Sequence, residues 1–138
     1  MEELIRDFLR QKSFAVVGSF RNETKYAYQI LKTLKNKGYE AYPVNPRLKE
    51  VEGLPCYSTI KDIPVVCDVV NIVTPPRITE RIVRECKEKG VKRVWLQPGA
   101  ESQEAIKFCE DNGIKVIHSI CVMMEGVKKQ KEEEGGRR

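Results

Sequence analysis

Metal-binding residues are scarce in this sequence. It contains one histidine, His118, among 138 residues, and its five cysteines include no pair at Cys-x-x-Cys spacing. A tetrahedral zinc site draws on several such residues at close spacing, so the sequence predicts no metal site. Cys67, Cys86 and Cys109 stand among apolar residues. We expect these three cysteines to be small core residues without a redox role.

A long apolar run is also missing. No stretch approaches the ~18 apolar residues that a membrane-spanning helix needs. Residues 1–14 begin with Glu2 and Glu3 and are amphipathic, which is not the pattern of a secretory signal. We therefore expect a cytoplasmic protein that does not act at a membrane. The content of 41% hydrophobic and 33% charged residues favours a folded domain over a disordered chain.

Charge of one sign does not gather into a nucleic-acid-binding pattern. The net charge of +5 is compatible with an anionic partner, but the basic residues are dispersed among acidic ones. No stretch mixes aromatic and basic side chains as RNA-reading domains do, so we expect no nucleic-acid partner. Residues 1–130 are predicted to form one domain, and residues 131–138 a charged, flexible tail.

Five short runs rich in valine and isoleucine predict β-strands. They are too apolar to alternate between a polar and an apolar face, which is typical of parallel strands covered on both sides. The runs lie at 14–18, 40–44, 68–73, 93–96 and 114–118. Apolar residues at helical spacing predict helices between them, together with an amphipathic opening helix and a last helix. These helices are expected around 2–11, 26–34, 78–86, 105–109 and 122–130.

Glycines end three of the predicted helices. Gly38, Gly90 and Gly113 each stand where a helix stops and a strand begins, a position that favours the left-handed conformation. The repeated order of helix, glycine and strand indicates βα units. The sequence therefore predicts an α/β fold, a Rossmann-like three-layer sandwich with a five-stranded parallel sheet.

Ligands of such sheets bind beyond the carboxyl ends of the strands. After the first predicted strand, Gly18 allows backbone amides to approach a ligand, and Ser19 offers a hydroxyl. Arg21 and Lys25 are suited to phosphates, which the start of the following helix also attracts. The alternative is an ordinary loop with a capping residue. One glycine where the dinucleotide fingerprint has three argues against a standard NAD site.

The loop after the second predicted strand carries Asn45, Pro46 and Arg47. Dehydrogenases of this fold place an acidic residue here to bind ribose hydroxyls, whereas Arg47 suits a phosphate better. A simple Asn-Pro turn is the alternative interpretation.

Two further loops reach the same edge of the sheet. Thr74, Pro75 and Pro76 follow the third predicted strand and form a rigid wall suited to a flat ring, although Pro76 also fits the first turn of a helix. Gln97 and Gly99 follow the fourth strand. Gln97 is predicted to hydrogen-bond a ligand or close the site, and Gly99 again permits close approach of the backbone.

The order and spacing of these segments resemble a family, the small stand-alone CoA-binding proteins, whose domain also occurs in the α subunit of succinyl-CoA synthetase. The resemblance spans about residues 14–125. It rests on V-V-G-S, V-N-P, E-G-L-P-C-Y-S-T-I-K-D-I-P, V-T-P-P and V-W-L-Q-P-G. The chain departs from the family's pattern in the first loop and before Cys121, where the family usually has an arginine.

The resemblance implies coenzyme A as the ligand and assigns each loop a part. Residues 18–25 would receive the phosphates, Asn45 and Pro46 would line the nucleotide side, residues 74–76 would flank the adenine or the pantetheine, and residues 97–99 would form the far wall.

No carboxylate pair or catalytic triad stands out, so we expect a binding or regulatory module rather than an enzyme. His118 is expected to be structural or adjacent to the ligand, and Cys121 is a candidate for a mixed disulfide with CoA. A small NAD(P)-binding oxidoreductase is the alternative function. Expected partners are CoA or an acyl-CoA, with a second copy of the chain or an acyl-CoA enzyme as candidate protein partners.

Overall fold

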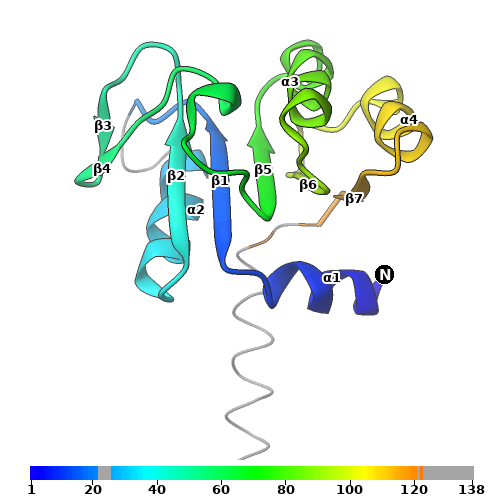
Figure 1. Cartoon of the computed structure of the whole chain (residues 1–138), viewed down its shortest axis with the longest axis horizontal. Helices are drawn as coiled ribbons and strands as arrows, with labels where there is room; N and C mark the ends of the chain where they lie inside the picture. The colour runs from blue at the N-terminus through cyan, green and yellow to red at the C-terminus, as the bar shows by residue number, and fades with distance from the viewer. Residues whose placement is uncertain (22–25, 121, 123–138) are drawn as a thin grey trace, which may run out of the picture.

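Five parallel strands form the central sheet of this computed structural model, which describes residues 1–21, 26–120 and 122 (Figure 1). The sheet order is β2-β1-β5-β6-β7, and every neighbouring pair is parallel. All five predicted strands are confirmed, each beginning within one residue of its expected position. They are β1 (Ser13–Gly18), β2 (Glu40–Val44), β5 (Val69–Val73), β6 (Arg93–Leu96) and β7 (Lys115–His118).

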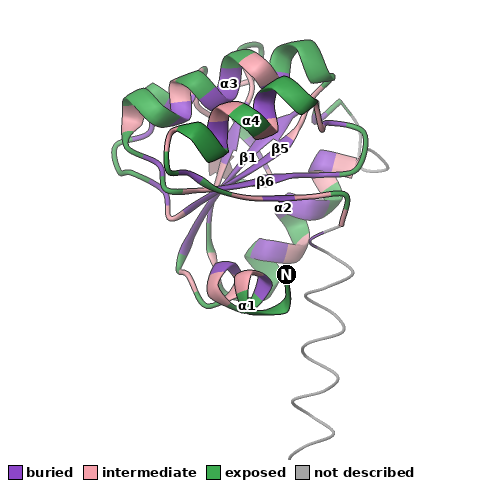
Figure 2. Cartoon of the chain, turned by 90° about the vertical axis from the view of Figure 1, so that its right-hand side faces the viewer, coloured by how far each residue is buried: buried purple, intermediate pink, exposed green. Residues whose placement is uncertain are grey.

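Helices cover both faces of the sheet (Figure 2). One face is covered by α3 (Pro76–Lys89), α4 (Gln103–Asp111) and the short 3₁₀ helix η1 (Ile60–Asp62). The other face is covered by α1 (Glu2–Leu9) and α2 (Tyr26–Asn36). The predicted α/β, Rossmann-like three-layer arrangement is confirmed. The predicted last helix, apart from Val122, and the predicted tail at 131–138 lie outside the described residues.

The central strand β1 supplies both halves of the core. All six of its residues are buried, because its neighbours β2 and β5 flank it and helices cover both of its faces. Ala15 and Val17 pack toward α3, while Phe14 and Val16 pack toward α1 and α2. Full burial on both faces explains why the strand is an unbroken apolar run in the sequence.

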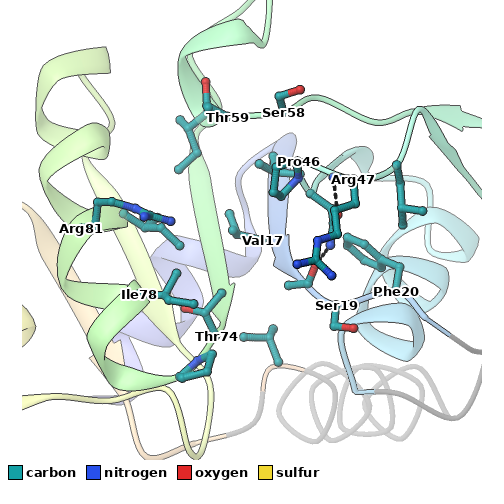
Figure 3. A pocket seen from close by; sticks show the side chains of 18 of the residues that line it. Val17, Ser19, Phe20, Pro46, Arg47, Ser58, Thr59, Thr74, Ile78 and Arg81 are labelled. Carbon is teal, nitrogen blue, oxygen red and sulfur yellow. Dashed lines mark hydrogen bonds between the residues drawn. The ribbon is translucent and has the colours of Figure 1, made fainter.

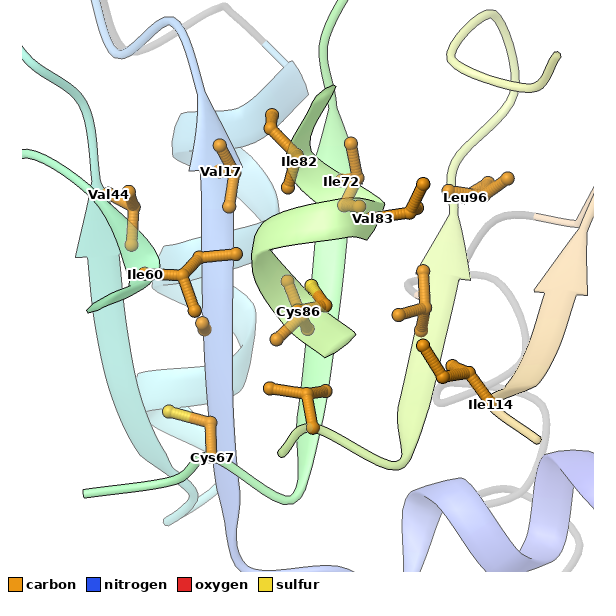
Figure 4. Packing of buried hydrophobic residues seen from close by; sticks show 14 of the residues in the cluster. Val17, Val44, Ile60, Cys67, Ile72, Ile82, Val83, Cys86, Leu96 and Ile114 are labelled. Carbon is orange, nitrogen blue, oxygen red and sulfur yellow. The ribbon is translucent and has the colours of Figure 1, made fainter. Parts of the chain in front are cut away.

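Three cysteines, Cys67, Cys86 and Cys109, belong to the core on the α3 side. Figure 4 shows Cys67 and Cys86 in this core. Burial raises the pKa of Cys67 and of Cys109 to about 12, and it raises the pKa of Cys86 well above its usual value. Thiols with such pKa values stay protonated at neutral pH and are poor nucleophiles. The expectation that these cysteines are apolar core residues is confirmed.

The predicted helix-ending glycine at position 90 has φ = 90° and follows the last residue of α3. Gly38 and Gly113 likewise have positive φ values, 89° and 72°. A short hairpin of β3 (Glu50–Val51) and β4 (Leu54–Pro55) between β2 and η1 was not predicted. Two-residue strands are too short to carry an alternating pattern.

Charged side chains at the amino ends of the strands are paired. Asp7 of α1 accepts a hydrogen bond from Arg93 Nε of β6 at 2.8 Å, and Lys115 Nζ lies 3.6 Å from the same carboxylate. The bond from Arg93 lowers the pKa of Asp7. Asp68 accepts hydrogen bonds from the amides of Lys12 and Ser13, both at 3.1 Å. Burial raises the pKa of Asp68, but these bonds outweigh it and leave the pKa lowered.

Among the described residues, no helix combines the length and the apolar character that crossing a membrane requires.

Candidate functional site

The strand order reverses between β1 and β5. From β1 the chain runs through α2 to β2 on one side, and it then returns across β1 to reach β5 on the other side. In open parallel sheets, ligands bind in the crevice at such a reversal, beyond the carboxyl ends of the strands. The loops that follow β1, β2 and β5 meet at this point.

A pocket of about 650 Å³ opens there (Figure 3). Cavities that bind small molecules are typically ~300–1,000 Å³. One side, which we call the loop wall, consists of Gly18, Ser19, Phe20, Arg21, Asn45, Pro46, Arg47 and Leu48. The other side, which we call the helix wall, consists of Ser58, Thr59, Ile60, Ile78, Arg81, Ile82 and Glu85. The lining is completed by Val17, Val44, Val73, Thr74 and Pro75.

Gly18 ends β1 where α2 and β5 come close to the backbone. A Cβ atom on this residue would lie 2.8 Å from the Cβ of Ala27 and 3.1 Å from the carbonyl oxygen of Val73. The first contact is shorter than real Cβ atoms show and the second is tight, so the packing of α2 against the sheet favours glycine here.

The Asn45 side chain joins the two loops of the loop wall. Its Nδ2 donates a hydrogen bond to the Gly18 carbonyl oxygen at 2.8 Å, and its Oδ1 accepts one from the Arg47 amide at 2.8 Å. The residue lines the pocket as predicted. Its amide group also fixes the backbone of Arg47 relative to the end of β1.

Three arginines line the pocket. Arg21 and Arg47 belong to the loop wall, and Arg81 of α3 lies across the pocket from Arg47 (Figure 3). Within the part of the chain that the structure describes, no ion pair engages any of the three guanidinium groups. By contrast, Arg84 of the same helix pairs with Glu104 at 3.2 Å. The pocket therefore presents positive charge that the described residues do not neutralise, apart from Glu85 on the helix wall.

Eight of the predicted site residues come together in this pocket: Gly18, Ser19, Arg21, Asn45, Pro46, Arg47, Thr74 and Pro75. Pro76 is the first residue of α3 and does not line the pocket. Lys25 and Cys121 lie outside the described residues. The roles of all these residues as ligand contacts stay predictions.

Gln97 and Gly99 do not line the pocket. Gln97 is fully buried, donates through Nε2 to Asn71 Oδ1 at 3.0 Å and accepts from the Val122 amide at 3.0 Å. A buried amide needs such partners, and these tie the segment after β7 to the central strands. Gly99 has φ = 92°, and its amide donates to Glu101 at 2.7 Å in the turn that precedes α4.

The helix wall was not predicted as part of the site from the sequence. Ile78, Arg81, Ile82 and Glu85 occupy one face of α3 at spacings of three, four and seven residues. In the sequence, Ile78 and Ile82 belong to the apolar residues at helical spacing that predict the helix at 78–86. The two charged residues at the same helical spacing are a signal that this face also reaches solvent.

The lone histidine lies at the end of β7 and does not line the pocket. His118 Nδ1 is 3.0 Å from the hydroxyl of Ser119. A histidine acting as a general base is usually oriented by a carboxylate or a carbonyl group, and no such bond to His118 is present among the described residues.

Comparisons with known proteins identify a family for the chain. The family model described as "CoA binding domain" matches residues 12–127. The α subunit of acetate–CoA ligase [ADP-forming] II from Pyrococcus furiosus is 32% identical over 126 residues, which cover 83% of this chain and 28% of that protein. The chain thus spans less than a third of this curated relative.

Two solved structures match over nearly their whole length. A conserved hypothetical protein from Pyrococcus furiosus has a TM-score of 0.79 and 41% identity, over 83% of this chain and 98% of its own. A hypothetical protein from Pyrococcus horikoshii OT3 has a TM-score of 0.88 and 34% identity, over 93% of this chain and 91% of its own.

Proposed function

We propose, because the chain belongs to the CoA-binding domain family, that its pocket binds coenzyme A or an acyl-CoA and that the protein acts as a non-catalytic binding or regulatory module. The observation that carries this proposal is the loop wall. It lies at the strand-order reversal and contains Arg21 and Arg47, and its described residues include no carboxylate. Coenzyme A carries a pyrophosphate and a 3′-phosphate, and arginine guanidinium groups are favoured partners for phosphate.

The lining of the pocket supports binding more than chemistry. Glu85 is the one carboxylate among the described lining residues, and no histidine or cysteine accompanies it. General acid–base chemistry needs a titratable group within hydrogen-bond reach of the reacting atom, commonly with a second group that orients it. The relatives named as acetate–CoA ligases are several times longer, so a protein partner that supplies the chemistry fits the same proposal.

Isothermal titration tests the ligand directly. Coenzyme A, dephospho-CoA and NAD⁺ are titrated into the purified chain under one buffer condition. We expect micromolar binding of coenzyme A that weakens at least tenfold without the 3′-phosphate, which corresponds to about 1.4 kcal/mol. Binding of NAD⁺ without binding of coenzyme A would overturn the proposal and favour the NAD(P)-linked alternative.

A further inference from the structure

The two walls of the pocket differ in formal charge. Among the described lining residues, the loop wall holds Arg21 and Arg47 without a carboxylate, whereas the helix wall holds one positive and one negative side chain, Arg81 and Glu85. Phosphates are attracted to unbalanced positive charge, and a balanced wall offers them much less. An uncharged part of a ligand is therefore favoured on the helix wall.

The helix wall also presents apolar surface. Ile78 is 38% exposed and is one of four large apolar side chains exposed to such a degree among the described residues. It points into the pocket (Figure 3), with buried Ile60 and Ile82 also lining this wall. Branching at Cβ restricts all three side chains to few rotamers. They form a firm apolar surface against which a flat ring can pack.

Glu85 gives this wall a hydrogen-bond acceptor. The residue is half-buried, and within the described part of the chain no hydrogen bond or close ion pair engages its carboxylate. Its charge acts only at longer range on Lys61, whose pKa it helps to raise. An ionised carboxylate only accepts hydrogen bonds, so the matching ligand group is an N–H donor. A flat ring with an exocyclic amino group combines both features of the wall.

We propose that the helix wall recognises the adenine base of the ligand, with the ring packed on Ile78 and its 6-amino group donating to Glu85. This assignment rests on the proposed function. The base, the 3′-phosphate and the pyrophosphate of coenzyme A are all attached to one ribose. Placing the base against the helix wall therefore leaves both phosphates beside the loop wall, with Arg47 and Arg21 as their partners.

A ligand and variant cycle tests the role of Glu85. Coenzyme A and an analogue with unsubstituted purine in place of adenine are titrated into the wild type, Glu85→Leu and Glu85→Gln. Glu80→Leu is the matched control, because Glu80 lies on the same helix and does not line the pocket. We expect the wild type and Glu80→Leu to prefer coenzyme A over the analogue about tenfold. Glu85→Leu should bind both ligands alike, and Glu85→Gln, which keeps an acceptor, should retain part of the preference.

Phosphopantetheine, which lacks the adenosine, separates the two parts of the ligand. It should bind the wild type and Glu85→Leu equally, and circular dichroism checks that each variant is folded. The inference is overturned if the wild type binds coenzyme A and the purine analogue equally, or if Glu85→Leu weakens phosphopantetheine. The proposed function fails in a different way, through absence of coenzyme A binding to the wild type, and the inference then falls with it.

Discussion

The two ends of the central sheet use charge in opposite ways. At the amino ends of the strands, the carboxylate of Asp7 is paired with Arg93 and Lys115, and Asp68 receives two backbone amides. At the carboxyl ends, Arg21 and Arg47 line a pocket, and no ion pair engages them in the described residues. Charge that is satisfied within the chain stabilises the fold, whereas charge left open toward a pocket is available to a ligand.

This difference predicts that substitutions at one end of the sheet change ligand affinity and that substitutions at the other end change stability. A variant at the carboxyl end should lose ligand and keep its stability, and a variant at the amino end should do the reverse.

The largest effect is expected for Arg47→Gln. Its guanidinium lines the pocket without an internal ion pair in the described chain. Loss of a charge-assisted contact to a phosphate should weaken coenzyme A binding about thirtyfold, which corresponds to about 2 kcal/mol, with the melting temperature unchanged. Titration calorimetry and thermal unfolding measure the two quantities. Arg84→Gln is the control, since Arg84 pairs with Glu104 away from the pocket, and an equal loss of binding there would contradict the prediction.

A smaller effect, on stability alone, is expected for Asp7→Asn. Asp7 and Arg93 are both 20% exposed, so removing the carboxylate leaves a largely buried guanidinium without its charged partner. We expect the free energy of unfolding to fall by about 1–2 kcal/mol, with coenzyme A affinity unchanged. Urea unfolding measures this loss. Asp111→Asn removes a surface pair with Lys107 and should cost less than about 0.5 kcal/mol; equal losses in the two variants would refute the distinction.

The smallest effect is a difference in pH dependence. Hydrogen bonds hold the folded pKa values of Asp7 and Asp68 below the ordinary value of an aspartate. Stability from these groups is therefore present above pH ~4 and is lost as the pH falls below it toward the folded pKa values. Binding should weaken earlier, below pH ~6, where a phosphate monoester takes up its second proton. Measured between pH 7 and 2.5, titration should show coenzyme A affinity falling below pH ~6, and urea unfolding should show stability falling below pH ~4. Asp7→Asn should reduce the pH dependence of stability below pH ~4 and leave the pH dependence of binding unchanged.

The strands were predictable because both of their faces are covered. Val69–Val73 and Arg93–Leu96 need apolar residues almost throughout, and that requirement is visible in the sequence. The hairpin at 50–55 left no such trace, because two residues a strand do not make a pattern.

The site was harder to predict because one residue type can serve two purposes. Gln97 follows a strand at the binding edge, just as Asn45 does. Its side-chain amide, however, is hydrogen-bonded inside the core to Asn71 and to the backbone amide of Val122. Whether a polar side chain turns inward or toward the pocket depends on contacts distant in sequence. The helix wall was hidden for a similar reason, since Ile78 looks like any other member of an apolar helix stripe.

The two hydrogen bonds of Asn45 have a kinetic consequence. They hold the backbone at Gly18 and at Arg47 together through contacts within the chain itself. A ligand that arrives at this part of the pocket therefore need not organise it, and little conformational entropy is lost on binding there. Association should proceed at a rate governed by encounter and orientation, so differences in affinity between ligands should appear mainly as differences in how long each one stays bound.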